Sequence, residues 1–262
     1  MGKDLLGPSI VMDQALGNRG MRIDMERKKW TLLELGTVEY RDAWDLQSRL
    51  VEARKGRALD RDIVLFLEHP PVFTLGRRGG HGNLRVSESF LEERGIPVIH
   101  VERGGDITYH GPGQLVIYPI VDLKALGLDV SGYVTRLEEV MIRTVGDFGV
   151  MAERDPKNRG AWVGGNKIGS IGIAIRHGIT FHGLALNINT GLAPFTWIHP
   201  CGLQEIEITS IERELGSGVS MEEAFRRAKY NMEEVFGVEL VRVDIQDMRS
   251  MVPDPAAKKA FD

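Results

Sequence analysis

The residue best suited to nucleophilic chemistry is Cys201, the only cysteine in the 262-residue chain. It stands between Pro200 and Gly202, a turn-like setting that favours an exposed thiol over a packed one. A lone cysteine is more often an inert small apolar residue, and both interpretations stay open here. The seven histidines permit a cysteine–histidine pair, but no diagnostic ligand spacing such as His-x-x-x-His occurs. We therefore expect no metal site.

The second candidate is Lys167, the one cation in the glycine-rich run from Gly164 to Gly172. This run stands at the start of a predicted buried strand. A lysine at a strand end is usually solvated. In a crowded, partly desolvated pocket its pKa falls, and its amine can then accept a proton. From the residues alone, either position is possible.

A binding loop is predicted from Arg103 to Gln114, where flexible backbone, a cation, hydroxyls and an imidazole fall within one connection before a strand. The amides of Gly104 and Gly105 suit a carbonyl or oxyanion, and Tyr109 and His110 would form a wall beside it. The alternative interpretation is a structural loop with a hydrogen-bonded histidine.

Nucleotide motifs do not fit the glycine-rich loops. Val116 follows Gly113 where a dinucleotide fingerprint needs a further glycine. Asn166 follows the run from Gly160 to Gly165 and breaks the P-loop spacing. The glycines therefore indicate positions where another group comes close to the backbone, but not a nucleotide-binding loop.

Composition limits the remaining classes. The chain is 42% hydrophobic, carries a formal net charge of -4 and has a pI near 6.0, which argues against a broad nucleic-acid surface. A single cysteine cannot form an internal disulfide, and no apolar run approaches the ~20 residues of a membrane helix. We expect a cytoplasmic protein with no membrane or nucleic-acid partner.

The hydrophobic pattern predicts an α/β (α+β) fold with one central sheet flanked by helices. The predicted strands are Trp30 to Leu35, Ile63 to Leu67, Val72 to Leu75, Val98 to Val101, Leu115 to Ile120, Lys167 to Ile175, Ile179 to Asn187 and Val238 to Val243. Helical spacing covers Tyr40 to Val51 and Val134 to Phe148. A tight turn at Arg176, His177 and Gly178 predicts an antiparallel hairpin and hence a mixed sheet. Ser220 and Glu223 form a capping box for a last helix that Gly237 ends.

One domain accounts for most of the chain, because no linker-like composition divides its middle. We expect a flexible N-terminal extension over residues 1–29, a catalytic domain over 30–243 and a poorly ordered tail over 244–262.

Three blocks of this sequence together resemble the lipoyl(octanoyl) transferase family. The first runs from Arg103 to Gln114 and is followed by Tyr118 and Pro119. The second combines Lys167 to Gly172 with His182 to Asn187, and the third runs from Pro200 to Leu203. The resemblance covers roughly residues 30 to 240 and implies a mixed-sheet fold similar to biotin and lipoate protein ligases.

The resemblance also implies an activity that needs no cofactor and takes place in the cytoplasm. An octanoyl group would move from octanoyl-acyl carrier protein, through a thioester on Cys201, to a lysine of a lipoyl domain. Lys167 would lower the pKa of the cysteine. Substrate-binding positions implied by the family are Arg103, Gly104, Gly105, Asp106, Ile107, Thr108, Tyr109, His110, Ser170, Ile171, Gly172, Gly183, Leu184 and Ala185.

Two rival functions remain open at this point. One is an ATP-dependent lipoate or biotin ligase of the same fold, which would need no nucleophilic cysteine. The other is a silent module that only holds the carrier protein. Because carrier proteins are acidic, basic residues would contact them locally, and the candidates are Arg77, Arg78, Arg176 and His177.

Overall fold

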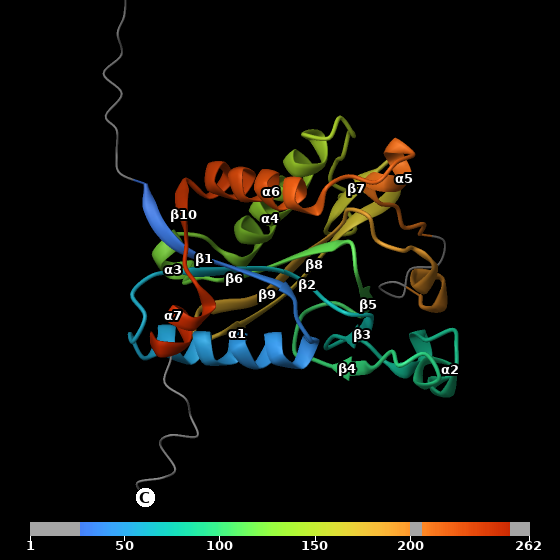
Figure 1. Ribbon diagram of the computed structural model, residues 1–262, viewed down its shortest axis with the longest axis horizontal. Coiled ribbons are helices and arrows are strands. Elements are labelled where there is room, and N and C mark those ends of the chain that lie inside the picture. The colour runs from blue at the N-terminus through green and yellow to red at the C-terminus, as the bar shows by residue number, and fades with distance from the viewer. Residues whose placement is uncertain (1–26, 200–205, 252–262) are drawn as a thin grey trace, which may run out of the picture.

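The computed structural model describes residues 27–199 and 206–251 (Figure 1). Within these residues the large sheet has seven strands in the order β10-β1-β2-β6-β9-β8-β7. Its strands are β1 (Lys28–Thr37), β2 (Ile63–Glu68), β6 (Gln114–Ile120), β7 (Ala161–Val163), β8 (Asn166–Arg176), β9 (Ile179–Asn187) and β10 (Val238–Arg242). Strand β1 runs parallel to β10 and β2, and the other pairs are antiparallel. The predicted mixed sheet is confirmed.

Helices cover both faces of this sheet. The helices of the described residues are α1 (Tyr40–Lys55), α2 (Glu88–Glu92), α3 (Leu123–Leu126), α4 (Val130–Gly146), α5 (Ile211–Leu215), α6 (Met221–Phe236) and α7 (Ile245–Met251), with short turns η1 (His81–Asn83) and η2 (Ala193–Trp197). Helices α4 and α6 lie over one face and α1 over the other (Figure 1). In the described part of the chain, no helix is both long and apolar enough to cross a membrane.

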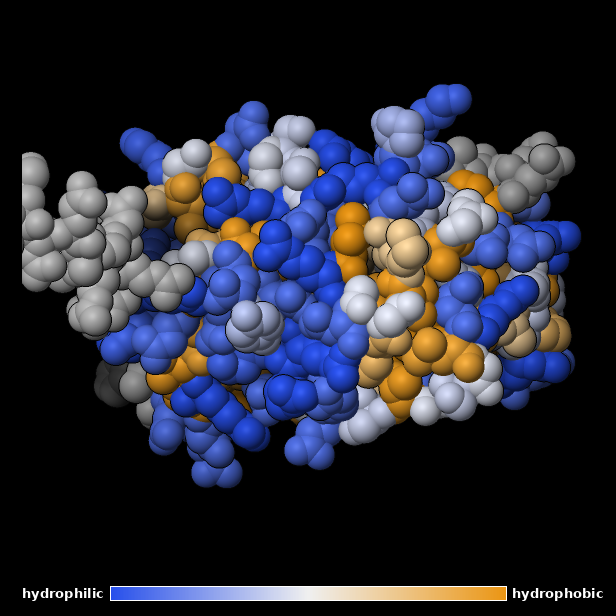
Figure 2. Space-filling model, turned by 90° about the horizontal axis from the view of Figure 1, so that it is seen from above, coloured by the Kyte–Doolittle hydropathy of each residue, from blue (hydrophilic) through white to orange (hydrophobic). Residues whose placement is uncertain are grey.

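Strand periodicity divides the apolar residues between two cores. On β2, Val64 and Phe66 enter the core beneath α4 and α6, whereas Leu65 and Leu67 enter the core beneath α1. Successive side chains of a strand point to opposite faces, so a strand buried on both sides reads as a continuous apolar run. Seen from outside, the face carrying α4 and α6 is mostly hydrophilic, and its hydrophobic side chains gather on the side where β7 and α5 lie (Figure 2).

A second, smaller sheet corrects the prediction of one central sheet. Strands β3 (Val72–Leu75), β4 (Val98–His100) and β5 (Ile107–His110) form it in the order β4-β3-β5. Pro70 and Pro71 separate β2 from β3, and prolines cannot donate to a ladder, so β2 does not continue. Strand β5 lies inside the segment that we predicted to be one connection.

The hairpin of β8 and β9 is confirmed in its detail. Arg176 pairs with Ile179, and the two residues between them, His177 and Gly178, have φ of 55° and 82°. Positive φ at both central residues is the mark of a type I′ turn, whose twist matches that of the strands. The hairpin is long, so it carries Lys167 and Arg176 at opposite ends of β8.

The predicted start and end of helix α6 are confirmed. Ser220 accepts a hydrogen bond from the Glu223 amide at the start of α6, and Gly237, with φ of 67°, ends that helix as predicted. Strand β1 begins at Lys28, two residues before the expected domain boundary. Met248 of α7 is only 3% exposed and packs into the α1 core.

Candidate active site

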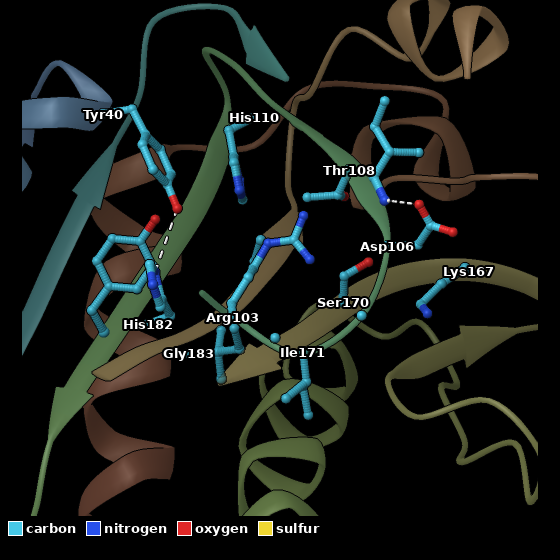
Figure 3. Close-up of a pocket in the computed structure, with 16 residues that line it drawn as sticks. Tyr40, Arg103, Asp106, Thr108, His110, Lys167, Ser170, Ile171, His182 and Gly183 are labelled. Carbon is cyan, nitrogen blue, oxygen red and sulfur yellow. Dashed lines mark hydrogen bonds between the residues drawn. The ribbon is translucent and has the colours of Figure 1, made fainter. Parts of the chain in front are cut away.

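A pocket lies between β5 and the ends of β6, β8 and β9, close to the first residue of α1 (Figure 3). Its empty space is about 500 Å³, open solvent at the mouth included. The lining residues are Tyr40, Arg103, Gly105, Asp106, Ile107, Thr108, His110, Tyr118, Lys167, Ser170, Ile171, Gly172, His182, Gly183, Leu184 and Ala185.

Most of the predicted site residues therefore line one cavity, although two of the described ones, Gly104 and Tyr109, do not. Gly104 lines a neighbouring groove, and its amide donates to the Ile173 carbonyl at 2.8 Å. Tyr109 was expected to form a wall of the site but packs against Phe73 and Phe195 instead. Alternate residues of a strand face opposite ways, so Thr108 and His110 face the pocket while Tyr109 does not. Cys201 lies outside the described residues.

Arg103 is buried inside the pocket wall. Its Nη2 donates to the Thr74 carbonyl at 2.7 Å and to Thr74 Oγ1 at 2.9 Å. Glycine at two positions makes this possible. A Cβ at Gly172 would stand 2.8 Å from Arg103 Cδ, and one at Gly76 would stand 2.8 Å from Arg103 Nη1. The predicted glycine clusters thus give the guanidinium room to lie flat against β8.

Lys167 is only 6% exposed, which is unusual for lysine. Its backbone joins two segments, since its amide donates to the Glu207 carbonyl at 2.9 Å and its carbonyl accepts from the Thr209 amide at 2.9 Å. Its Nζ stands 5.2 Å from the centroid of the Trp162 ring. Of the two positions considered for this lysine, the structure shows the crowded, partly desolvated one.

Three histidines and two tyrosines form a polar cluster at the end of the pocket away from Lys167. His69 Nδ1 donates to the Val38 carbonyl at 2.6 Å, and its Nε2 accepts from Tyr118 Oη at 2.9 Å. His110 Nδ1 donates to Gln114 Oε1 at 2.7 Å. Each imidazole is thus held by hydrogen bonds that suit its neutral form.

Burial keeps these rings uncharged. It lowers the pKa of His69 to about 4 and that of His182 to about 3, and it holds the pKa of His110 well below its ordinary value. The rings of His69 and His110 contact each other edge to face, with centroids 5.6 Å apart. Among the described residues, no group of three His, Cys, Asp or Glu side chains is arranged to hold a metal ion.

His182 has an unusual backbone inside β9, with φ of 54°. Its amide donates to Gln47 Oε1 of α1 at 2.6 Å, and its Nδ1 stands 3.4 Å from Tyr40 Oη (Figure 3). Its Nε2 has no hydrogen-bond partner among the described residues. Left-handed backbone in a histidine costs free energy and is concentrated at functional sites. Contacts from α1 therefore hold β9 in this shape.

The sequence did not identify Tyr40, Tyr118 and His182 as residues of the site. Helical spacing had marked Tyr40 as a core residue of α1, and nothing local shows that it meets β9. Tyr118 and His182 fell inside the family blocks, but neither was among the predicted substrate-binding residues, and His182 was considered only as a base in place of Lys167. Buried polar residues in an otherwise apolar strand, such as Tyr118 and His182, are the signal that could have found them.

A family model of the lipoyl protein ligase A/B catalytic domain matches residues 39–233 of this chain. An octanoyltransferase from Desulfotalea psychrophila is 49% identical over 208 residues, which are 79% of this chain and 93% of the relative. The chain belongs to the octanoyltransferase family. It is an acyltransferase that serves protein lipoylation, so the predicted family and enzyme class are confirmed.

Solved structures agree on the fold of this octanoyltransferase family member. The bipartite lipoate protein ligase of Thermoplasma acidophilum superposes with a TM-score of 0.68 at 16% identity, covering 86% of this chain and 91% of the ligase. Biotin protein ligase from Aquifex aeolicus gives a TM-score of 0.52 at 12% identity over 79% and 70% of the two chains. The predicted likeness in fold to lipoate and biotin ligases is confirmed.

Proposed function

We propose that this enzyme transfers an octanoyl group from octanoyl-acyl carrier protein to the ε-amine of a lysine in a lipoyl domain, through a thioester on Cys201. Lys167 moves the protons in both halves of the reaction. Neither half needs a cofactor, and both substrates belong to the cytoplasm.

The observation that carries this proposal concerns the described residues on either side of segment 200–205. On one side the His199 amide donates to the Asn83 carbonyl at 2.9 Å, and Asn83 Nδ2 donates to Asp106 of the pocket at 2.6 Å. On the other side the Glu207 carbonyl accepts from the amide of Lys167 at 2.9 Å. The described residues on either side of the segment that contains Cys201 are thus linked by hydrogen bonds to residues that line the pocket, through Asn83 on one side and directly on the other.

In the first half-reaction the Cys201 thiol gives its proton to the neutral amine of Lys167. The thiolate then attacks the carbonyl carbon of the donor thioester. A free thiol of pKa about 8.5 is only a few per cent thiolate near neutral pH, so a neighbouring base raises the reactive fraction. The tetrahedral intermediate collapses, the carbon–sulfur bond to the carrier breaks, and Lys167 returns the proton to the departing carrier thiolate. Octanoyl-Cys201 and a free carrier thiol result.

In the second half-reaction the lipoyl-domain lysine attacks octanoyl-Cys201 as a neutral amine. Lys167 accepts the proton that the new amide nitrogen must lose, and then passes it to the Cys201 thiolate as that group departs. Backbone amides near the cysteine stabilise the oxyanion in both halves. The enzyme ends in the protonation state in which it began.

The acyl chain has a suitable place to lie. Gly172 and Gly183 are cross-strand partners on β8 and β9 and both line the pocket. A Cβ at Gly172 would crowd Arg103, and one at Gly183 would overlap the Ile117 carbonyl of β6, so both positions need glycine. The pocket beside them extends from Lys167 to Tyr40 and His182 (Figure 3). The predicted substrate contacts at Ser170, Ile171, Leu184 and Ala185 lie along the same two strands.

Intact-mass spectrometry tests the proposal directly. Incubation with octanoyl-acyl carrier protein alone should add one octanoyl group, which peptide mapping assigns to Cys201 and a lipoyl domain then removes. Cys201→Ala should give no adduct. A separate incubation with free octanoate and ATP tests the ligase alternative. An adduct on another residue, or acyl transfer that requires ATP, would show that the proposal is wrong.

A further inference from the structure

A second hollow, here called the groove, adjoins the pocket and shares lining residues with it. The shared residues are Gly105, Asp106, Lys167, Ile171 and Gly172. The groove holds about 1170 Å³ of empty space, open solvent included, against about 500 Å³ for the pocket. Lys167 therefore lies where the smaller pocket meets the larger groove, and a molecule reaching Lys167 through the groove would contact the residues that line it.

Positive charge dominates the groove. Arg78, Lys157 and Arg159 line it together with Lys167, and Asp106 is the one carboxylate among its described lining residues. Arg159 Nη1 is paired with the buried Glu138 at 3.0 Å. Arg78 and Lys157 are exposed, and neither side chain makes a hydrogen bond or ion pair with another described residue. These two cations are therefore available to a ligand.

Both cations stand on backbone that is tied to the site. The amide of Arg78 donates to the Gly105 carbonyl at 3.1 Å, next to the segment that lines the pocket. The amides of Lys157 and Asn158 both donate to Asp155 Oδ1, at 2.8 and 2.7 Å. The two cations thus come from separate segments and line one groove, and each backbone position is fixed by hydrogen bonds.

We propose that Arg78 and Lys157 bind the phosphodiester of the pantetheine arm that carries the donor's acyl group. This inference rests on the proposed function, because it assumes a carrier-bound thioester. With the thioester carbonyl beside Lys167 and the acyl chain in the pocket, the arm must leave through the groove. Its phosphodiester is then the anion that meets the two cations. Arginine binds such oxygens with two parallel hydrogen bonds, and lysine acts as a point charge.

Two small donors that differ only in phosphate test this proposal without the carrier protein. They are octanoyl-pantetheine, which has none, and octanoyl-4′-phosphopantetheine. The measured quantity is the ratio of their kcat/KM values for acylation of the full-length enzyme. For the wild type we expect a preference of about 10- to 100-fold for the phosphorylated donor, since a hydrogen bond to a charged group contributes about one factor of ten or more. This ratio should fall as salt is added.

The variants should change this ratio of kcat/KM values by different amounts. Arg78→Gln and Lys157→Gln should each lower it, and the double glutamine variant should bring it close to one. The double glutamate variant should invert it, because the phosphate then meets like charge. Lys124→Glu is the matched control: it reverses an exposed charge on α3, outside the groove, and should keep the wild-type ratio.

A wild-type ratio near one would overturn the proposal, as would variants that keep the wild-type ratio. If the same variants slow octanoyl-acyl carrier protein but not the phosphorylated small donor, the two cations contact acidic side chains of the carrier and not the arm, and the proposal is again wrong. Failure of the proposed function looks different: no donor, with or without phosphate, would then acylate Cys201.

Discussion

Gly160 packs directly against the side chain of Lys167. A Cβ built at Gly160 would stand 2.9 Å from Lys167 Cε and closer still to the Gly169 carbonyl. The amide of Gly160 donates at 3.0 Å to Glu138, a carboxylate of α4 that is only 1% exposed. Helix α4 thus holds the glycine in place, and the glycine sets how far the lysine side chain can move.

This contact predicts that Gly160→Ala impairs catalysis in a folded enzyme. The methyl group would overlap the Gly169 carbonyl and crowd Lys167 Cε, so β8 around Lys167 must shift, and φ of 137° at this position is strained for alanine. A shift of a catalytic group by ~1 Å can slow a reaction by about 100-fold. Single-turnover acylation and transfer rates should fall together. Gly80→Ala, where a Cβ meets nothing within 4 Å, is the control. Equal rates for the two variants would refute a positioning contact.

The contact between Tyr40 and His182 predicts that the polar cluster contributes to the free energy of unfolding. Tyr40→Phe removes the hydroxyl 3.4 Å from His182 Nδ1 and leaves a buried imidazole with no hydrogen-bond partner among the described residues at either ring nitrogen. An unsatisfied buried polar group costs about 1 to 3 kcal/mol, and we expect about 1 to 2 kcal/mol from urea unfolding. Tyr230→Phe, at a tyrosine that is 60% exposed, is the matched control and should change little. A loss equal to that of the control would show that the contact contributes nothing.

The buried histidines predict how stability depends on pH. The pKa values of His69, His110 and His182 all lie below the ordinary value near 6.5, with those of His69 and His182 at about 4 and 3. Between about pH 4 and 6.5 the unfolded chain therefore binds more protons than the folded one. Stability falls as the pH is lowered through this window, by up to about 1.4 kcal/mol per pH unit for each group. Above about pH 7 both states are neutral and the effect ends.

Urea midpoints at pH 7, 5.5 and 4.5 measure this dependence. His110→Gln should lower its slope, whereas a substitution at the exposed His177 should leave it unchanged. A flat profile across the window would contradict neutral burial of the three rings.

The sequence could predict those elements whose causes are local. His177 and Gly178 specify their turn by positive φ, and Ser220 specifies the start of α6 by its cap. The small sheet was not predictable in this way, because β5 exists only through pairing with β3 some thirty residues earlier. A short apolar run does not by itself show which strand it pairs with or in which register.

The same distinction applies to the site. Ser170 and Gly183 could be predicted from the sequence blocks that contain them, because β8 and β9 bring these two blocks together through one hairpin. Tyr40 reaches the pocket because α1 packs on β9, more than a hundred residues later. Tyr109 was misplaced because its strand, and therefore the alternation of faces, was not foreseen. Packing between segments that are distant in the sequence decides such positions, and the spacing of residues along the chain does not reveal that packing.

Substitution of Lys167 separates its two proposed roles, toward the Cys201 thiol in acylation and toward the incoming amine in transfer. Lys167→Ala should slow acylation and transfer alike, each by about 10²- to 10⁴-fold, because both steps lose their proton acceptor. Raising the pH should restore part of each rate, since bulk water then supplies thiolate and free amine. Cys201→Ala should recover neither.

Lys167→Arg keeps the charge but cannot act as a base at accessible pH. If this variant acylates at nearly the wild-type rate yet fails to transfer, Lys167 acts on the thiol through its charge and on the amine as a base. Rapid-quench measurement of each half-reaction reads the two rates separately. Wild-type rates for Lys167→Ala near neutral pH would show that the assignment is wrong, and His110 or His182 of the same pocket would then be the next base to test.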